Sequence, residues 1–373
     1  MRIWVERLTL TDFRNYASLT LHVGPNPVVV VGANGSGKTN LLEALSLLAP
    51  GPGLRHTPYQ ELARIGTSGW AVAGRINLPD GAVDVGTGRS AEDGRAGRRV
   101  RINGEEQASG ALAGLCEVLW LTPSMDGLFV GPSSDRRRFL DLLIASFDPS
   151  YRALMQRFQR AMQQRNRLLA EDVSEPARFA GLERLMAEAG VAIAAARCAA
   201  VAELAAAIRL RRDGARGAAF PWAELDLVGG LESALFLRPA VEVEDGYAAE
   251  LAEGRERDRA QRRTLRGPHR SDLIVTHGPK GLPADRCSTG EQKALLIGLV
   301  LAHADLIQRR SSAAPILLLD EIAAHLDAAR REALFAELCA LASQAWLSGS
   351  DPEIFSPLQR GQILCLEDGR IRL

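Results

Sequence analysis

The chain has few lysines and no excess charge of either sign. Lysine supplies only three of its 45 basic residues, and 45 acidic residues balance them. Composition alone therefore gives no indication that the protein binds nucleic acid. The preference for arginine fits a GC-rich genome and selection for phosphate-gripping side chains equally well.

Paired cysteines are also absent. The five cysteines stand apart, with no C-x-x-C pair, at positions 116, 198, 287, 339 and 365. We therefore expect reduced thiols and no zinc site, as is usual for a cytoplasmic protein. No basic stretch followed by an apolar one opens the chain, and Arg197 and Glu203 interrupt the alanine-rich segment 190–208. Neither a secretory leader nor a membrane span is expected.

A glycine-rich segment follows a run of four valines near the N-terminus. Residues 32–39 match G-x-x-x-x-G-K-[ST], with a strand expected before them and a helix after them. We expect the backbone N–H groups and the helix dipole to bind phosphate, Lys38 to contact the β- and γ-phosphates, and Thr39 to ligate Mg²⁺. The nucleotide-binding residues predicted here are Gly32, Ala33, Asn34, Gly35, Ser36, Gly37, Lys38 and Thr39.

Two adjacent acids end an apolar run far downstream. Residues 316–319 are expected to form a buried strand, and Asp320 and Glu321 follow it. Asp320 is the predicted second metal ligand, acting through water, and Glu321 is the predicted general base. Together these two acids form the predicted catalytic pair.

A third segment indicates how two subunits cooperate. Ser288 and Gly290 lie in a turn before an apolar helical run, with Glu291 beside them, and the order S-x-G-x-Q is similar to the signature of ABC-type ATPases. Such a helix start binds anions, so we expect each subunit to cap the γ-phosphate of its partner in a head-to-tail dimer. Asp327 lies in a segment similar to the D-loop of these dimers.

Short alternating segments at 3–10, 19–23, 28–31, 71–78, 82–87 and 98–103 predict a β-rich platform beside the nucleotide-binding strand. Residues 11–16 are the expected turn between its first two strands. Within it, Arg14 and Asn15 are candidate nucleotide contacts, although ordinary turn chemistry is the alternative.

From about residue 149 the apolar period becomes helical. Two helices, separated near 172–176, are expected to pair antiparallel, either as a projecting arm or as a hairpin packed on the core. The charged run 255–263 is either a solvated helix or a contact surface. The predicted fold class is α/β, a discontinuous ABC-type ATPase head at 1–148 and 264–373 with an inserted helical arm at 149–263.

The ordered motifs resemble the RecF family of bacterial recombination mediators, which is related to SMC and Rad50 heads. The resemblance rests on the phosphate loop, the signature at Ser288, the acids at Asp320, and segments 12–16, 132–141, 164–166 and 267–273. The segments 136–141 and 267–270 are the more particular to this family.

This resemblance implies an ATP- and Mg²⁺-dependent homodimer on double-stranded DNA and gap junctions. It implies RecR as a partner, with RecO as a further one, support for RecA loading in DNA repair, replication and the SOS response, and slow ATP hydrolysis as a release switch. No membrane partner is implied. Alternatives are a nuclease-linked SMC-like head and a transporter nucleotide-binding subunit. More than 200 residues between Lys38 and Ser288 argue against the transporter.

Three positions depart from the family pattern. Glu321 stands where a second aspartate is frequent, and His325 stands where a small residue or an acid is common. The switch position has no histidine, since residues 348–351 are Ser-Gly-Ser-Asp. Asp351 is the candidate to replace it as a sensor of the γ-phosphate.

Overall fold

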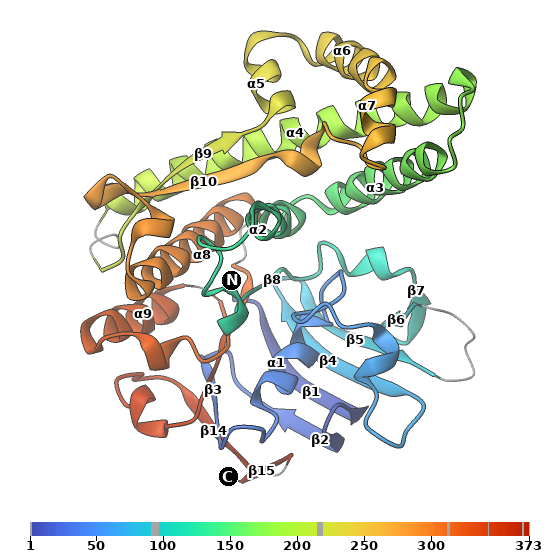
Figure 1. Cartoon of the computed structure of the whole chain (residues 1–373). Helices are drawn as coiled ribbons and strands as arrows, with labels where there is room; N and C mark the ends of the chain where they lie inside the picture. The colour runs from blue at the N-terminus through green and yellow to red at the C-terminus, as the bar shows by residue number, and fades with distance from the viewer. Residues whose placement is uncertain are drawn as a thin grey trace. The chain divides into compact units, whose positions relative to one another are not determined.

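The computed structural model of the chain describes residues 2–90, 97–214, 219–311, 314–341, 343–367 and 369–372, without the side chains of His325 and Arg372. The chain forms two compact units, coloured along the sequence in Figure 1. Unit 1 comprises Met1–Asp126, Arg211–Phe220 and Thr289–Leu373, and unit 2 comprises Gly127–Leu210 and Pro221–Ser288. Residues 127–148 and 264–288, expected in the head, therefore pack within unit 2. The functional division into head and arm stays a prediction, and the departure at His325 lies outside the described side chains.

The platform in unit 1 is an antiparallel sheet of order β2-β1-β4-β5-β6-β7. Its strands are β1 (Trp4–Phe13), β2 (Tyr16–His22), β4 (Trp70–Leu78), β5 (Gly81–Arg89), β6 (Arg99–Ile102) and β7 (Glu105–Gln107). Phe13 pairs with Tyr16, so the turn is only Arg14 and Asn15. The turn predicted over 11–16 is thus too long, because residues 11–13 belong to β1 and Tyr16 already belongs to β2.

The second sheet of unit 1 contains β3, the strand before the predicted phosphate loop, and has the order β15-β14-β3-β13-β12-β8. Its strands are β3 (Val28–Val31), β8 (Val118–Leu121), β12 (Ile316–Leu319), β13 (Ala345–Gly349), β14 (Gln362–Glu367) and β15 (Arg370–Arg372). All neighbours pair parallel except β14 and β15. The continuous apolar runs of β3, β8 and β12 are buried throughout, as expected for parallel strands that are covered on both faces of the sheet.

Helices α1 (Lys38–Ser46), α8 (Thr289–Ser311) and α9 (Ala328–Ala340) complete unit 1. Helix α1 contacts strands of both sheets, β1 and β13 (Figure 1). The fully buried Gln344 joins the sheets by polar contacts. Its Oε1 accepts from the Val5 amide (3.0 Å), and its Nε2 donates to the Gly24 carbonyl (2.8 Å). A buried amide satisfied in this way stabilises one relative placement of the two sheets.

Unit 2 is mainly helical. Its helices are α2 (Ser133–Ala145), α3 (Pro149–Ala170), most of α4 (Pro176–Asp213), α5 (Gly230–Leu237), α6 (Ala240–Glu253) and α7 (Arg255–Ala260). Asp148 caps α3 by accepting from the Ser150 amide, and Pro149 occupies the first turn.

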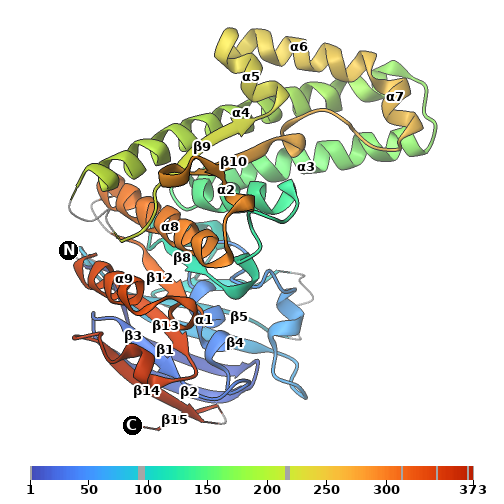
Figure 2. The same ribbon diagram turned by 60° about the vertical axis from the view of Figure 1, so that its left-hand side comes forward.

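Helices α3 and α4 pair antiparallel, which confirms the predicted pairing of the two helices (Figure 2). Arg157 bonds Glu188, whereas the later residue Arg165 bonds the earlier Glu183. In unit 2, β9 (Ala223–Val228), β10 (Asp272–His277) and β11 (Leu282–Pro283) form an antiparallel sheet.

By length and apolar composition, α4 is the one helix in the described part of the chain that could cross a membrane. Half of its most apolar window is buried inside the protein, and the core helix of a soluble protein passes the same test. Within α4, Arg197 is 2% exposed and binds Asp141 at 2.9 Å. The absence of a membrane span stays a prediction.

Candidate nucleotide site

The loop of residues 32–37 joins β3 to α1 and needs glycine at two positions for steric reasons. A Cβ on Gly32 would lie 2.3 Å from the Leu366 carbonyl oxygen of β14. Gly37 has φ of 113°, a left-handed conformation that other residues rarely adopt, and it caps α1. The strand, loop and helix order predicted from the sequence is confirmed, and the loop amides lie at the positive end of α1.

The β1–β2 turn supports this loop from behind. The Asn15 side chain donates to the Ser36 carbonyl (3.0 Å) and accepts from Asn40 (2.8 Å). Tyr16 donates its hydroxyl proton to the Gly37 carbonyl (2.9 Å). Burial raises the pKa of Tyr16, so this donor stays protonated. Asn15 therefore contacts the loop itself, which is compatible with its predicted position beside a nucleotide.

Lys38 lies across the loop and is 4% exposed. Its ammonium donates to the carbonyls of Gly32 (2.8 Å) and Ala33 (3.0 Å), and Glu321 Oε1 is 3.9 Å away. The hydroxyl of Ser36 is buried without a hydrogen-bond partner in the described structure. A buried cation and an unsatisfied hydroxyl in one loop fit an anionic ligand.

Thr39 and Asp320 meet although 281 residues separate them in sequence. The Thr39 hydroxyl is 3.0 and 2.9 Å from the two Asp320 oxygens. Asp320 is 3% exposed and follows β12, which lies next but one to β3 in the sheet. A hydroxyl and a carboxylate are oxygen ligands of the kind that Mg²⁺ prefers, so these residues fit the predicted metal.

Ser348 completes this cluster, and the sequence analysis missed its role. Its hydroxyl donates to Asp320 Oδ1 (2.6 Å) and accepts from the Glu321 backbone N–H (2.9 Å). Glu321 has φ of 52°, a conformation that costs a non-glycine residue about 1–3 kcal/mol. The available signal was a lone hydroxyl in the otherwise apolar, buried strand β13.

Arg14 lies beside α1, and its side chain forms hydrogen bonds with other residues of the chain. Its guanidinium forms two 2.8 Å bonds to Glu43, which is 1% exposed, and one of 2.9 Å to Thr57. Arg14 itself has φ of 53°. Both the turn interpretation and the nucleotide contact remain compatible with this position, and the contact stays a prediction.

The signature residues lie where α8 begins. Ser288 precedes the first residue of α8, and Gly290 and Glu291 lie in its first turn. Apart from the neighbouring residues and the backbone of its own helix, no described atom would lie within 4 Å of a Cβ on Gly290. Their predicted action on a partner's nucleotide stays a prediction.

The two remaining candidates act as helix caps. Asp327 caps α9 by accepting from the Arg330 amide (2.9 Å). Asp351 similarly accepts from the Glu353 amide (2.9 Å). It is Ser348 that contacts both predicted catalytic acids, Asp320 and Glu321, and a sensing role for Asp351 stays a prediction.

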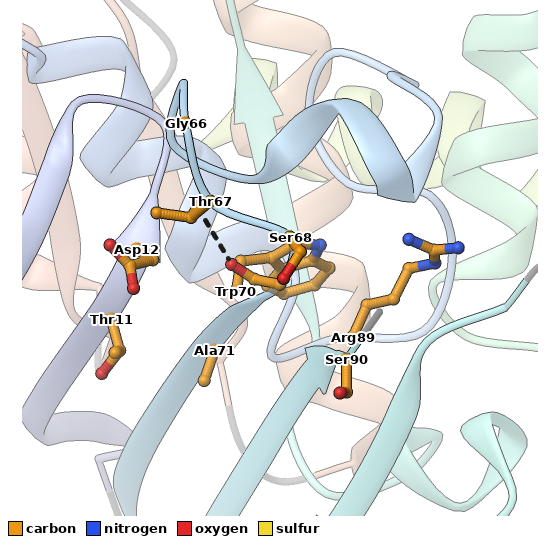
Figure 3. A pocket seen from close by; sticks show the side chains of 10 residues that line it. Thr11, Asp12, Gly66, Thr67, Ser68, Trp70, Ala71, Arg89 and Ser90 are labelled. Carbon is orange, nitrogen blue, oxygen red and sulfur yellow. Dashed lines mark hydrogen bonds between the residues drawn. The ribbon is translucent and has the colours of Figure 1, made fainter. Parts of the chain in front are cut away.

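A separate hollow of about 610 Å³ opens on the platform (Figure 3). Asp12 from β1, Trp70 from β4 and Arg89 from β5 contribute to its lining, and the Thr67 hydroxyl lies 3.4 Å from the Gly69 carbonyl. None of its lining residues belongs to the predicted site.

Segments 136–141 and 267–273, both singled out in the sequence, bond to each other inside unit 2. Arg136 forms two 2.8 Å bonds to Asp272, and these bonds raise the pKa of Arg136. Arg137 donates to the Ser271 carbonyl. Arg138 is 80% exposed. These segments therefore stabilise unit 2, and Arg138 alone of the three arginines faces solvent.

Comparison with known proteins agrees with this geometry. The family described as RecF/RecN/SMC N terminal domain matches residues 4–356. A DNA replication and repair protein RecF of Mesorhizobium japonicum is 52% identical over 371 residues, covering 98% of this chain and 97% of the relative. The chain belongs to the RecF family. A RecF of Rhizobium meliloti is 48% identical over 99% of both chains.

Solved structures give the fold of this RecF-family chain. A structure described as the recombination mediator protein RecF-ATPrS in the RecFOR pathway has a TM-score of 0.86 at 20% identity, covering 99% of this chain and 98% of that chain. An Smc head domain from Pyrococcus furiosus has a TM-score of 0.54 at 16% identity, covering 99% of this chain and 95% of that chain. The predicted α/β ABC-type ATPase head fold is confirmed.

Proposed function

We propose that this RecF-family protein binds ATP and Mg²⁺, dimerises on DNA at single-strand gaps or junctions, and supports RecA loading in recombinational repair. Slow hydrolysis of ATP would then release the dimer. RecR, with RecO as a further partner, would act with it in the cytoplasm. The observation that carries the proposal is the cluster of Lys38, Thr39, Asp320 and Glu321 at the end of β3 and β12. The names of the relatives support the repair role.

The chain's own residues account for binding and hydrolysis. The loop amides and Lys38 would bind the phosphates. The Lys38 ammonium would exchange its bonds to the carbonyls of Gly32 and Ala33 for bonds to phosphate oxygens. Thr39 and Asp320 would hold Mg²⁺, which when bound neutralises phosphate charge. Glu321, whose backbone Ser348 fixes, would accept a proton from the attacking water.

The DNA-binding part of the proposal rests on exposed arginines of unit 2. Arg165 is fully buried, so it is unavailable, whereas Arg138, Arg160 and Arg167 are exposed. Because the chain has no net charge, such arginines must gather on one face to bind phosphate, and dimerisation would achieve this.

A DNA titration against salt, with and without ATP, tests this proposal. We expect affinity to require ATP and to fall steeply with salt. A variant with Arg138, Arg160 and Arg167 changed to Ala should reduce the slope of log affinity against log salt by about 0.9 for each lost contact. Arg184→Ala, an exposed arginine of α4 paired with Asp245, is the control.

Lys38→Met should abolish the effect of ATP, because methionine has neither the charge nor the donors of lysine. Equal DNA affinity with and without ATP in the unaltered protein would contradict the proposal. Stimulation of ATPase activity by a membrane partner instead of DNA would favour the transporter alternative.

A further inference from the structure

Helix α3 has no acidic residue, although acids and bases balance in the chain as a whole. Its 22 residues include five arginines and no aspartate or glutamate. Between residues 156 and 167, every exposed side chain is a glutamine or an arginine. Such a face offers hydrogen-bond donors and positive charge, and it has no carboxylate of its own that would repel an anion.

A groove of about 440 Å³ opens on this face, where α3 lies beside α4 (Figure 2). Gln156, Arg157, Arg160 and Gln164 line it from α3, and Leu185 lines it from α4. Two alanines of α3 complete the lining. We call this hollow the α3–α4 groove. All of its residues belong to unit 2, and they combine four polar side chains with three apolar ones.

The polar side chains of the groove differ in how far the protein already uses them. Arg157 pairs with Glu188 at 2.8 Å. Arg160 forms no ion pair with a described residue, and its guanidinium donates to the carbonyl oxygen of Gln156 at 3.1 Å. That bond leaves the NH2 group of Gln156 without a partner among the residues that the structure describes. The groove therefore contains one uncompensated positive charge and at least one unused donor.

The positive face continues beyond the groove. Arg167 follows Arg160 by seven residues, which is two helical turns or about 10 Å along the axis, so both lie on one side of α3. Arg167 is exposed and, within the described ranges of the chain, has no acidic partner. Two free guanidinium groups in a row are suited to a ligand with regularly repeated negative charge.

The composition of this face distinguishes between polyanionic ligands. The two aromatic residues of α3, Tyr151 and Phe158, are both buried. Single-stranded nucleic acid is bound largely by stacking of its bases on aromatic side chains, and protein partners are usually anchored by large aromatic residues. The backbone of duplex DNA needs neither, because arginine and glutamine side chains hydrogen-bond to its phosphates.

We propose that the α3–α4 groove binds the sugar–phosphate backbone of duplex DNA. Arg160 and the amides of Gln156 and Gln164 bond phosphate oxygens, and Leu185 packs against a deoxyribose. The inference rests on the proposed function, which supplies DNA as the ligand, and it adds the surface and the mode of contact. Contacts of this kind position a duplex without reading its bases, so different sequences should bind equally well.

The test is a titration of the full chain, with ATP, against two fluorescent DNA duplexes of different base composition. The double variant Gln156→Ala with Gln164→Ala should weaken binding of both duplexes by about tenfold, because hydrogen bonds to charged phosphates are lost. The slope of log affinity against log salt should stay unchanged, since no charge is removed. Arg160→Ala should instead reduce that slope by about 0.9.

The matched control is Gln159→Ala with Gln163→Ala. These glutamines are exposed on the same helix but do not line the groove. The control should bind both duplexes as tightly as the unaltered protein. Equal melting temperatures of the two double variants would show that the loss of affinity does not come from unfolding.

A second pair of variants tests the apolar side of the groove. Leu185 is 37% exposed, so a polar side chain is tolerated there. Leu185→Glu should weaken DNA binding more than Leu185→Gln, because the two side chains have the same length and only glutamate repels phosphate. The difference between them should shrink as salt rises, since salt screens the repulsion.

The outcomes distinguish this inference from the proposed function. If the unaltered protein binds DNA with ATP, and the groove variants bind it equally well, the groove is wrong while the proposed function stands. If the unaltered protein does not bind duplex DNA with ATP, both are wrong. A loss confined to one of the two sequences would overturn the backbone mode of contact. Normal DNA binding with loss of RecR binding would make the groove a protein-docking surface and overturn the inference.

Discussion

Ser348 links Asp320 and Glu321, the two acids that we predict to carry out hydrolysis. Its hydroxyl bonds the side chain of Asp320 and the backbone of Glu321, and it is 1% exposed. Residues 348–351 lack the switch histidine that the resemblance to ABC-type ATPases leads one to expect, and the sequence suggested Asp351 as its replacement. The structure instead places a small hydroxyl there that keeps both acids in position.

Ser348→Ala should therefore reduce ATP turnover by about 10–100-fold, as is typical when a residue that orients a catalytic group is removed. ATP affinity should change little, because within the described residues the hydrogen bonds of Ser348 go to Asp320 and Glu321 and not to the loop or Lys38. Steady-state ATPase rates and equilibrium binding of a labelled nucleotide separate the two effects. Ser348→Thr, which keeps the hydroxyl, should retain most activity. Full activity in the alanine variant would show that Glu321 is positioned without it.

Helices α3, α4 and α7 are joined by a buried arginine. Arg165 is fully buried and bonds Glu183 (3.2 Å), Asp258 (2.7 Å) and the Leu251 carbonyl (2.7 Å). Arg255 also binds Glu183. Three elements separated in sequence therefore share one charge cluster.

Arg165→Ala should destabilise the protein by about 3–5 kcal/mol, because Asp258 would be left buried without its arginine and Glu183 would keep only Arg255. Arg157→Ala is the matched control on the same helix. Its pair with Glu188 is half-exposed and is worth about 0.2–1 kcal/mol. Denaturant unfolding of both variants measures the difference. Similar losses in the two variants would contradict the structural role of the Arg165 cluster.

In the predicted dimer, each nucleotide site is built from two subunits, because the Ser288 of one subunit acts on the nucleotide of the other. Ser288→Arg should leave ATP binding by one subunit nearly intact but prevent ATP-driven dimerisation, because a long side chain would fill the place of the partner's γ-phosphate. Lys38→Met should fail earlier, at nucleotide binding.

A mixture of these two variants would contain at most one complete composite site in each dimer. Partial recovery of dimer or ATPase activity in the mixture, absent from either variant alone, is the expected result. Sedimentation with a non-hydrolysable ATP analogue measures it. Normal dimerisation of the Ser288→Arg protein would show that Ser288 has no role at the partner's nucleotide and only precedes helix α8.

Local sequence was sufficient for the elements of the nucleotide site. Four consecutive β-branched residues before a glycine-rich loop predict β3, the loop and α1, because backbone sterics and burial act over a few residues. The apolar period of 3.6 likewise predicts α3 and α4 and their pairing. The acids at 320 and 321 were recognised because they end an apolar strand.

Contacts between distant residues required the folded chain. The bond between Thr39 and Asp320 and the anchoring of Glu321 by Ser348 depend on the order β3-β13-β12 in the sheet, which no local pattern encodes. Likewise, Arg165 and Arg160 look alike in the sequence, yet one is buried among acids and the other faces water. Burial and pairing depend on which segments pack together, so the same arginine stabilises the fold at one position and is open to a ligand at another.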